Sequence, residues 1–232
     1  TTQIFRSGSS KRLMKNVFGQ FDEDASVSFI AMDRPHWHEP DKEIVKLLND
    51  LNINGFHRPG GTDKATIHNY TGIFAYLLDP YRYMDCNLLE IGIQYGGSAL
   101  LWQEYLPGVR MDLVDIKDQV HDVIWDQLDE DRFDFYETDA YSATALRTLG
   151  NKKYHVIIDD GSHHRDDIKF VAEHYYHLLE AGGVMILEDI PDEALLKELT
   201  DLFNKEEQKG IRIFDVRESG RFDDLIWAII KQ

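Results

Sequence analysis

The chain has 232 residues, of which 43% are hydrophobic and 29% are charged, a balance typical of a globular protein with a sizeable core. Its 42 acidic and 25 basic side chains give a formal charge of −17, and the sequence contains no basic cluster that would attract nucleic acid or an anionic membrane. The single cysteine, Cys86, excludes an intrachain disulfide and a cysteine-based zinc site. No apolar run reaches the roughly 18 residues of a transmembrane helix, and no signal-peptide pattern opens the chain. We therefore expect a soluble, cytoplasmic protein.

Residues 1–54 are the least regular part of the chain, and we expect them to form an N-terminal extension. A helix is predicted within it at 42–51, from the start signal of Pro40 and Asp41. The extension would cover a substrate cleft or contact a second copy of the chain in a homo-oligomer. That expectation depends on its aromatic side chains: Phe5, Phe18, Phe21, Phe29 and Trp37. A glycine-rich loop and an apolar helix at 70–78 follow.

From residue 87 onward, short apolar runs alternate with helix-length segments. Seven strands are predicted at 88–93, 111–116, 133–138, 155–160, 184–189, 211–216 and 225–231. The clearest helices between them are predicted at 98–105, 166–180 and 192–209. This alternation predicts a parallel sheet covered by helices on both faces. The connection at 217–224 is too short for a crossover helix, so the last two strands are expected to pair antiparallel, a pattern typical of the class I methyltransferase fold.

A glycine-bearing turn follows the first of these strands, in the sequence LEIGIQYGGS at 89–98. Its glycines would let the backbone approach a ligand, and the helix that begins there offers free N–H groups to a phosphate or a carboxylate. The glycine spacing alone is a weak signal, because Gln94 replaces the middle glycine of G-x-G-x-x-G. Acids at the ends of the next two strands strengthen it, since Asp115 could accept ribose hydroxyls and Asp139 could meet an adenine amine. The candidate cofactor residues in this part are Glu90, Gly92, Gly96, Ser98, Asp115 and Asp139.

Three further acids follow the fourth and fifth strands: Asp160, Glu188 and Asp189. Neighbouring strand ends lie about 5 Å apart, so these carboxylates are expected to converge at one edge of the sheet. A hard divalent cation would relieve their mutual repulsion, and oxygen ligands favour Mg²⁺, Mn²⁺ or Ca²⁺ over zinc. The alternative is that these acids cap helices, since Asp189 comes shortly before a predicted helix.

His163 lies in the same loop as Asp160 and is the candidate general base, because a histidine titrates near neutral pH. His164 is the competing candidate.

These motifs carry a resemblance to a known family. The segments GTDK at 61–64, HNYT at 68–71, LEIGIQYGGS, VIIDDGSHH and MILEDI occur in the order found in class I S-adenosylmethionine-dependent methyltransferases. More narrowly, the chain resembles the metal-dependent sugar O-methyltransferases that tailor macrolides, of the mycinamicin and demethylmacrocin type. The resemblance covers about residues 55–232, and the first fifty-odd residues carry no motif of this family. Gln94 departs from the general methyltransferase motif but is tolerated in this subgroup.

The resemblance implies a Rossmann-like methyltransferase domain at 55–232, with a seven-stranded, mostly parallel sheet. The N-terminal helical extension expected at 1–54 precedes this domain. It implies S-adenosylmethionine as the methyl donor, Mg²⁺ or Mn²⁺ as the metal, and a sugar hydroxyl as the acceptor. The metal would lower the pKa of that hydroxyl, and His163 would remove its proton before the oxygen attacks the sulfonium methyl. Further cofactor contacts are expected from Thr62, Lys64, Tyr70 and Asp159. Lys64 would pair with the methionine carboxylate.

Three other interpretations stay open. A catechol-type O-methyltransferase also carries metal acids after strands four and five, although its set usually has an amide at the position of Asp189. A nicotinamide-dependent oxidoreductase would use Asp115 on the ribose, but the antiparallel hairpin and the later acids argue against it. A non-catalytic binding module that keeps the cofactor fold can be excluded only by an assay. The identity of the acceptor depends on loops whose shape the sequence does not specify.

Overall fold

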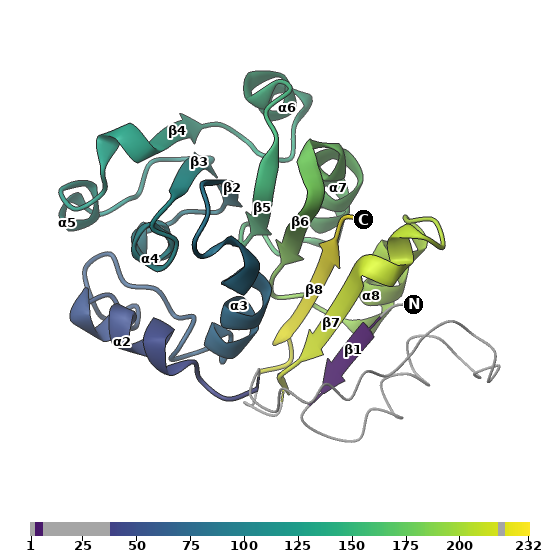
Figure 1. Cartoon of the computed structure of the whole chain (residues 1–232), viewed down its shortest axis with the longest axis horizontal. Coiled ribbons are helices and arrows are strands. Elements are labelled where there is room, and N and C mark those ends of the chain that lie inside the picture. The colour runs from purple at the N-terminus through teal and green to yellow at the C-terminus, as the bar shows by residue number, and fades with distance from the viewer. Residues whose placement is uncertain (1–2, 7–37, 218–220) are drawn as a thin grey trace.

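The computed structural model describes residues 3–6, 38–217 and 221–232. One eight-stranded sheet runs through the molecule, with the strand order β1-β7-β8-β6-β5-β2-β3-β4 (Figure 1). Its strands are β1 (Gln3–Arg6), β2 (Cys86–Ile91), β3 (Val109–Asp115), β4 (Phe133–Glu137), β5 (Tyr154–Asp159), β6 (Leu179–Leu187), β7 (Ile211–Asp215) and β8 (Leu225–Ile230).

All seven strands expected from the sequence are present, and the pairing of the last two is confirmed. β2 to β6 pair in parallel, whereas β8 lies between β6 and β7 and is antiparallel to both. β1 is an additional strand, which pairs in parallel with β7 at the edge of the sheet. The sequence pattern did not reveal β1, because four residues at a sheet edge carry too short a hydrophobic alternation to be recognised.

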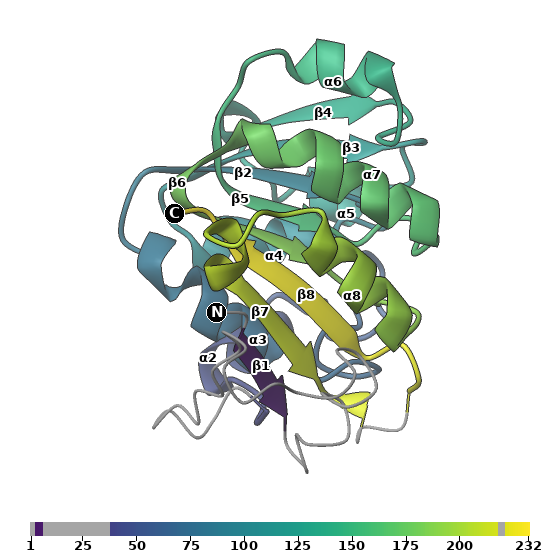
Figure 2. The ribbon, with the colours of Figure 1, turned by 90° about the vertical axis from the view of Figure 1, so that its right-hand side faces the viewer.

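Helices cover both faces of the sheet (Figure 2). The sheet divides the hydrophobic core into two layers, one on each face. The alternation of β5 shows the division, since Val156 and Ile158 pack with α3 and α4, whereas Ile157 packs on the opposite face with α7 and α8. The helices are α2 (Lys42–Asp50), α3 (Thr71–Leu78), α4 (Gly97–Tyr105), α5 (Asp122–Trp125), α6 (Ala143–Leu149), α7 (Arg165–Tyr175) and α8 (Glu193–Asp201).

Two of the expected helices end earlier than the sequence pattern suggested. α7 ends at Tyr175, and a 3₁₀ turn leads into β6, which already begins at Leu179. α8 ends at Asp201, because the Asn204 side chain accepts hydrogen bonds from two backbone N–H groups further along and closes a separate turn. Apolar residues continue past both helix ends, so periodicity alone overestimated the length of the helices.

The N-terminal extension is described only in part. Its expected helix is present as α2, while the aromatic residues Phe18, Phe21, Phe29 and Trp37 lie outside the described residues. The homo-oligomer and the boundary at residue 54 therefore stay predictions. Within the described part of the chain, every helix is too short or too polar to cross a membrane.

Candidate active site

A cavity of about 730 Å³ opens at the carboxyl ends of the parallel strands, the edge where open α/β sheets bind ligands. This volume lies within the range of about 300 to 1,000 Å³ that is typical of small-molecule and cofactor sites. Eight predicted site residues line the cavity: Thr62, Gly92, Ser98, Asp115, Asp139, Asp160, His163 and Asp189. Six others do not line it: Lys64, Tyr70, Glu90, Gly96, Asp159 and Glu188.

The glycine turn after β2 is held by a carboxylate rather than by its own glycines alone. One oxygen of Asp115, Oδ2, accepts hydrogen bonds from the backbone N–H groups of Ile93 and Gln94, at 2.8 and 2.9 Å. Gln94 has a φ of 47°, in the left-handed region where glycine is usually favoured. The two bonds to Asp115 stabilise that conformation, which explains how Gln94 replaces the middle glycine of the motif.

Gly92 permits a close approach between two strand ends. A Cβ atom at Gly92 would lie 2.2 Å from the backbone oxygen of Asp160, so every other residue would push the two apart. This contact brings the glycine turn next to the loop that carries the predicted acids. The glycine turn after β2 and the loop after β5 are therefore in direct contact at Gly92 and line one continuous cavity.

Two predicted cofactor acids, Glu90 and Asp159, are buried behind the cavity. Glu90 accepts a hydrogen bond from the indole N–H of Trp102, and Asp159 accepts one from the hydroxyl of Tyr141. Burial raises the pKa of both carboxyl groups to about 7. Tyr141 lines the cavity and was not predicted from the sequence, although it follows Asp139 at the end of a strand by only two residues. Asp159 thus reaches the cavity wall through Tyr141.

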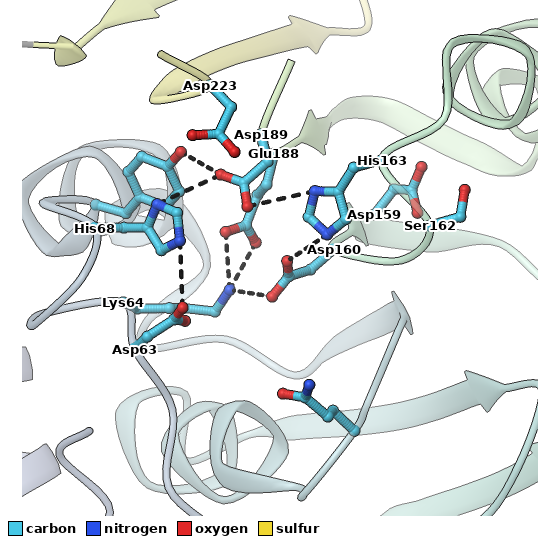
Figure 3. Close-up of polar contacts among 12 residues, drawn as sticks. Asp63, Lys64, His68, Asp159, Asp160, Ser162, His163, Glu188, Asp189 and Asp223 are labelled. Carbon is cyan, nitrogen blue, oxygen red and sulfur yellow. Dashed lines mark hydrogen bonds and ion pairs between the residues drawn. The ribbon is translucent and has the colours of Figure 1, made fainter. Parts of the chain in front are cut away.

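The second end of the cavity carries Asp160, His163 and Asp189, whose ligating atoms all lie within 4.8 Å of one another (Figure 3). The imidazole lies between the two carboxylates, with Nε2 at 3.7 Å from Asp160 Oδ1 and Nδ1 at 3.3 Å from Asp189 Oδ2. His163 and Asp189 have φ values of 56° and 50°, a region that costs free energy for residues other than glycine. Their backbone conformation is what directs both side chains toward the cavity.

The structure also separates the two adjacent histidines. His163 lines the cavity, whereas His164 is exposed and occupies the residue position before α7. The alternative that the acids cap helices is wrong, since the side chain that caps α8 is Asp192, which accepts a hydrogen bond from the N–H of Leu195 at 2.9 Å.

Lys64, for which a pairing with the methionine carboxylate is predicted, lies beneath the acids and pairs with two of them. Its Nζ atom is 2.8 Å from Asp160 Oδ2 and 2.8 Å from each oxygen of Glu188, and its side chain is 1% exposed (Figure 3). Burial lowers the pKa of Lys64, but the carboxylates of Asp160 and Glu188 outweigh burial and raise the pKa well above its usual value. Lys64 is therefore a buried ammonium ion paired with two predicted metal ligands.

His68 and Tyr70, from the same segment, hold Asp189 from the other side. The Tyr70 hydroxyl donates to Asp189 Oδ1, and the His68 ring stacks on the Tyr70 ring at 4.8 Å. His68 lies between Asp224, 2.7 Å from Nδ1, and Asp63, 3.2 Å from Nε2. Burial lowers the pKa of His68, but Asp63, Asp189 and Asp224 together raise it to about 9.

Asp224 was missed by the sequence reasoning. The signal that could have found it is the antiparallel direction of the last strand, which brings the start of β8 to the edge where the parallel strands end.

These donors fit a hard divalent cation. Asp160 and Asp189 each keep one oxygen on the side of His163, while their other oxygens are held by Lys64 and Tyr70. Carboxylate oxygens are ligands that Mg²⁺ and Mn²⁺ prefer, and the His163 imidazole lies beside these two. The opposite end of the cavity, with the Asp115 carboxylate and the N-terminus of α4, fits a cofactor with hydroxyl groups and a carboxylate.

Comparison with solved structures identifies the fold. Over 84% of this chain and 54% of the other, the structure matches the MycE methyltransferase of the mycinamycin biosynthetic pathway, in complex with Mg, SAH and mycinamycin VI, with a TM-score of 0.60 and 20% sequence identity. A second crystal form of MycE with Mg and SAH matches with a TM-score of 0.56 and 19% identity. The chain has the class I methyltransferase fold. The antiparallel β8 distinguishes this methyltransferase fold from the parallel dinucleotide-binding sheet of the oxidoreductase alternative.

Curated relatives resemble part of the chain in sequence. The chain is 28% identical over 146 residues to the 8-demethyl-8-alpha-L-rhamnosyl tetracenomycin-C 2'-O-methyltransferase of Streptomyces olivaceus, a match that covers 56% of this chain. It is 25% identical over 133 residues, or 53% of the chain, to the mycinamicin VI 2''-O-methyltransferase of Micromonospora griseorubida. The matched part is about a third of each relative, 35% and 32% of their lengths. No protein-family model matches the chain. The narrower resemblance to sugar O-methyltransferases is confirmed by these similarities.

Proposed function

We propose that the chain is an S-adenosylmethionine-dependent O-methyltransferase that requires a divalent metal and acts on a hydroxyl of a sugar or glycosylated natural product. One observation carries the proposal: Asp160, His163 and Asp189 lie at one end of a cavity whose other end is the glycine turn with Asp115. A sugar acceptor is supported by the names of the relatives, which act on rhamnosyl tetracenomycins and on mycinamicin VI.

We call the end of the cavity formed by the glycine turn and Asp115 the cofactor half, and the end formed by Asp160, His163 and Asp189 the acid half. In the cofactor half, we assign contacts to residues that line the cavity. Asp115 is assigned to the ribose hydroxyls: its Oδ2 atom is used by the turn, while Oδ1 accepts one N–H bond, from Lys117, and can still accept a bond from a hydroxyl. Asp139 is assigned to the adenine, and Thr62 and Ser98 to the methionine end near the start of α4. Glu90 and Gly96 act indirectly, by supporting the strand end and the turn from behind.

In the acid half, this chain's residues hold the acceptor and remove a proton. When bound, S-adenosylmethionine supplies the methyl group and the divalent cation polarises the acceptor oxygen. His163 accepts the proton of the hydroxyl, and the Asp189 oxygen 3.3 Å from Nδ1 stabilises the imidazolium that results. Asp160 and Asp189 are assigned to the cation. Glu188, which shares Lys64 with Asp160, is the third carboxylate of this cluster. The sulfonium leaving group needs no acid, so positioning and proton removal are the main tasks of the protein.

The proposal is tested with the purified chain, methyl-labelled S-adenosylmethionine and a set of acceptors: rhamnosylated polyketides, their aglycones and a simple catechol. We expect label on a sugar hydroxyl in the presence of Mg²⁺ and none after EDTA treatment. Calorimetry run in parallel measures binding of the cofactor and of Mn²⁺.

The outcomes separate the alternatives. Labelling of the catechol and of no sugar would support the catechol-type interpretation. Cofactor binding without transfer to any acceptor would support the non-catalytic module. Absence of cofactor binding would refute the proposal as a whole.

A further inference from the structure

The hydroxyl of Tyr141 is bound to the loop that carries Asp160 and His163. It donates a hydrogen bond to Asp159 Oδ1 at 3.1 Å and accepts one from the backbone N–H of Ser162 at 2.9 Å. Tyr141 itself follows β4, and β3 and β2 lie between β4 and β5 in the sheet. One side chain from the cofactor half therefore holds the loop after β5 on both sides of Asp160.

The loop after β5 is shaped to fit this hydroxyl. A Cβ atom at Gly161 would lie 2.0 Å from the hydroxyl oxygen of Tyr141, so the hydroxyl occupies the space that a side chain would take there. Two residues further on, His163 has a φ of 56°, a conformation that costs free energy outside glycine and that its surroundings must hold. The bonds of Tyr141 hold the loop in this shape, together with the hydrogen bond of 2.6 Å from the Ser162 hydroxyl to Asp167.

The backbone of Tyr141 belongs to the segment that faces the adenine in the proposed function. Its N–H donates to Asp139 Oδ1 at 2.9 Å, and the buried Tyr175 hydroxyl donates to the backbone oxygen of Ala140 at 2.6 Å. Asp139, Ala140 and Tyr141 all line the cavity. A ligand that contacts Asp139 therefore contacts the same short segment that holds the loop after β5.

We propose that Tyr141 is a positioning residue that links the two halves, so that the cofactor and the divalent cation each strengthen the binding of the other. This proposal rests on the proposed function, since it concerns the same two ligands. A cofactor at Asp139 orders the segment 139–141, and a cation at Asp160 requires an ordered loop after β5. Because one hydroxyl joins the two, the ligand that binds second finds the shared contact already ordered and loses less conformational entropy.

The test is the affinity for Mn²⁺ with and without saturating SAH, measured by electron paramagnetic resonance of the free ion. In wild type we expect SAH to tighten Mn²⁺ binding about fivefold or more, the lower end of typical coupling between two sites. Tyr141→Phe keeps the ring and removes both hydrogen bonds of the hydroxyl, and there we expect SAH to change the Mn²⁺ affinity by less than about twofold. Calorimetric SAH affinities with and without Mn²⁺ should show the same factors, because linkage is reciprocal.

The matched control is Tyr154→Phe. The Tyr154 hydroxyl also donates to a buried carboxylate, that of Asp112, but neither residue lines the cavity. Both variants lose a hydrogen bond to a carboxylate, so both should lower the free energy of unfolding, and a merely structural role would leave the coupling intact in both. We expect wild-type coupling in Tyr154→Phe and its loss in Tyr141→Phe alone. Wild-type coupling in Tyr141→Phe, equal loss in both variants, or no coupling in wild type would each overturn the proposal.

A second variant covers the case in which Tyr141→Phe does not fold. Gly161→Ala places a methyl group where the Tyr141 hydroxyl lies, so its two bonds cannot form and the coupling should again disappear. Wild-type coupling in Gly161→Ala would refute the linking role. Failure of wild type to bind Mn²⁺ would instead refute the metal-dependent function, and failure to bind SAH would refute the proposed function as a whole. Either result is distinct from two ligands that bind independently.

Discussion

The two halves of the cavity are built in different ways. The cofactor half, at the ends of β2, β3 and β4, is held by contacts between neighbouring elements, such as the bond from the Gln94 N–H to Asp115, 21 residues away. The acid half, at the ends of β5 and β6, is held by side chains from a distant segment. Lys64 pairs with Glu188 across 124 residues, and His68 contacts Asp224 across 156. The first half depends on the backbone, and the second depends on buried ion pairs.

This difference gives the two halves different chemical properties. A carboxylate that fixes a turn through backbone N–H groups makes a rigid contact surface, which suits a cofactor bound in one orientation. Buried ion pairs bring acids and a histidine close together at the cost of desolvation, which suits proton transfer and cation binding. The predictions below change one half at a time and measure both.

The largest expected effect comes from the histidine between the two acids. His163→Ala should lower kcat by roughly 10² to 10⁴-fold, the usual range for loss of a general base, while SAH affinity stays near that of wild type. His164→Ala is the matched control, since this exposed neighbour does not line the cavity, and its kcat should change little. Steady-state kinetics with the labelled acceptor assay measure both. An inactive His164→Ala beside an active His163→Ala would mean that the base is the other histidine.

Much of both halves could be predicted from the sequence, because strand ends carry local signals. The acids Asp115, Asp139, Asp160 and Asp189 each follow an apolar run, and parallel strands bring such ends to one edge. The short polar connection before β8 predicted the antiparallel hairpin for a similarly local reason.

The partner of Lys64 could not be predicted in the same way. A glycine-rich loop with Asp-Lys is compatible with an exposed lid or with a buried ion pair, and only the packing of the loop against β6 decides between them. The role of Asp224 depends on which strand neighbours β8, a property of the whole sheet. Long-range pairs of this kind leave no periodic pattern in the chain.

The second prediction concerns the pH dependence of stability in the acid half. The folded-state pKa of His68 is raised from 6.5 to about 9, so its charge stabilises the fold fully below about pH 6.5 and this contribution is lost as pH rises through about 9. One pKa unit corresponds to about 1.4 kcal/mol, so the contribution is at most about 3.5 kcal/mol. Urea unfolding of wild type and of His68→Asn, with EDTA present, should show the difference in their unfolding free energies shrinking between pH 6.5 and pH 9.5. A difference that is independent of pH over this range would show that the folded-state pKa of His68 is not raised.

The third prediction concerns the cofactor half alone. Asp115→Ala should weaken SAH binding by about 1.5–3 kcal/mol, the range for a hydrogen bond to a charged group, because it removes the ribose contact and releases the turn at Ile93 and Gln94. Its Mn²⁺ affinity should stay at the wild-type level, since the side chain of Asp115 accepts its hydrogen bonds from Ile93, Gln94 and Lys117, at the other end of the cavity. Calorimetry measures both affinities on the same sample. Equal losses of SAH and Mn²⁺ binding would mean that the two halves are not separable.

The smallest expected effect separates an acid of the site from an acid of the scaffold only three residues away. Asp192 caps α8 and pairs with Arg165, so Asp192→Ala should lower the free energy of unfolding by about 1 to 2 kcal/mol, as loss of an N-cap does. It should leave Mn²⁺ binding unchanged, because the side chain is absent from the cavity lining.

Asp189→Asn, the matched variant, should do the reverse: it keeps the shape of a side chain that caps no helix but removes the charge that faces His163. Urea unfolding and Mn²⁺ titration of both variants measure this contrast. Loss of Mn²⁺ binding in Asp192→Ala would extend the cation site onto α8 and would remove the distinction between structural and functional acids at this edge.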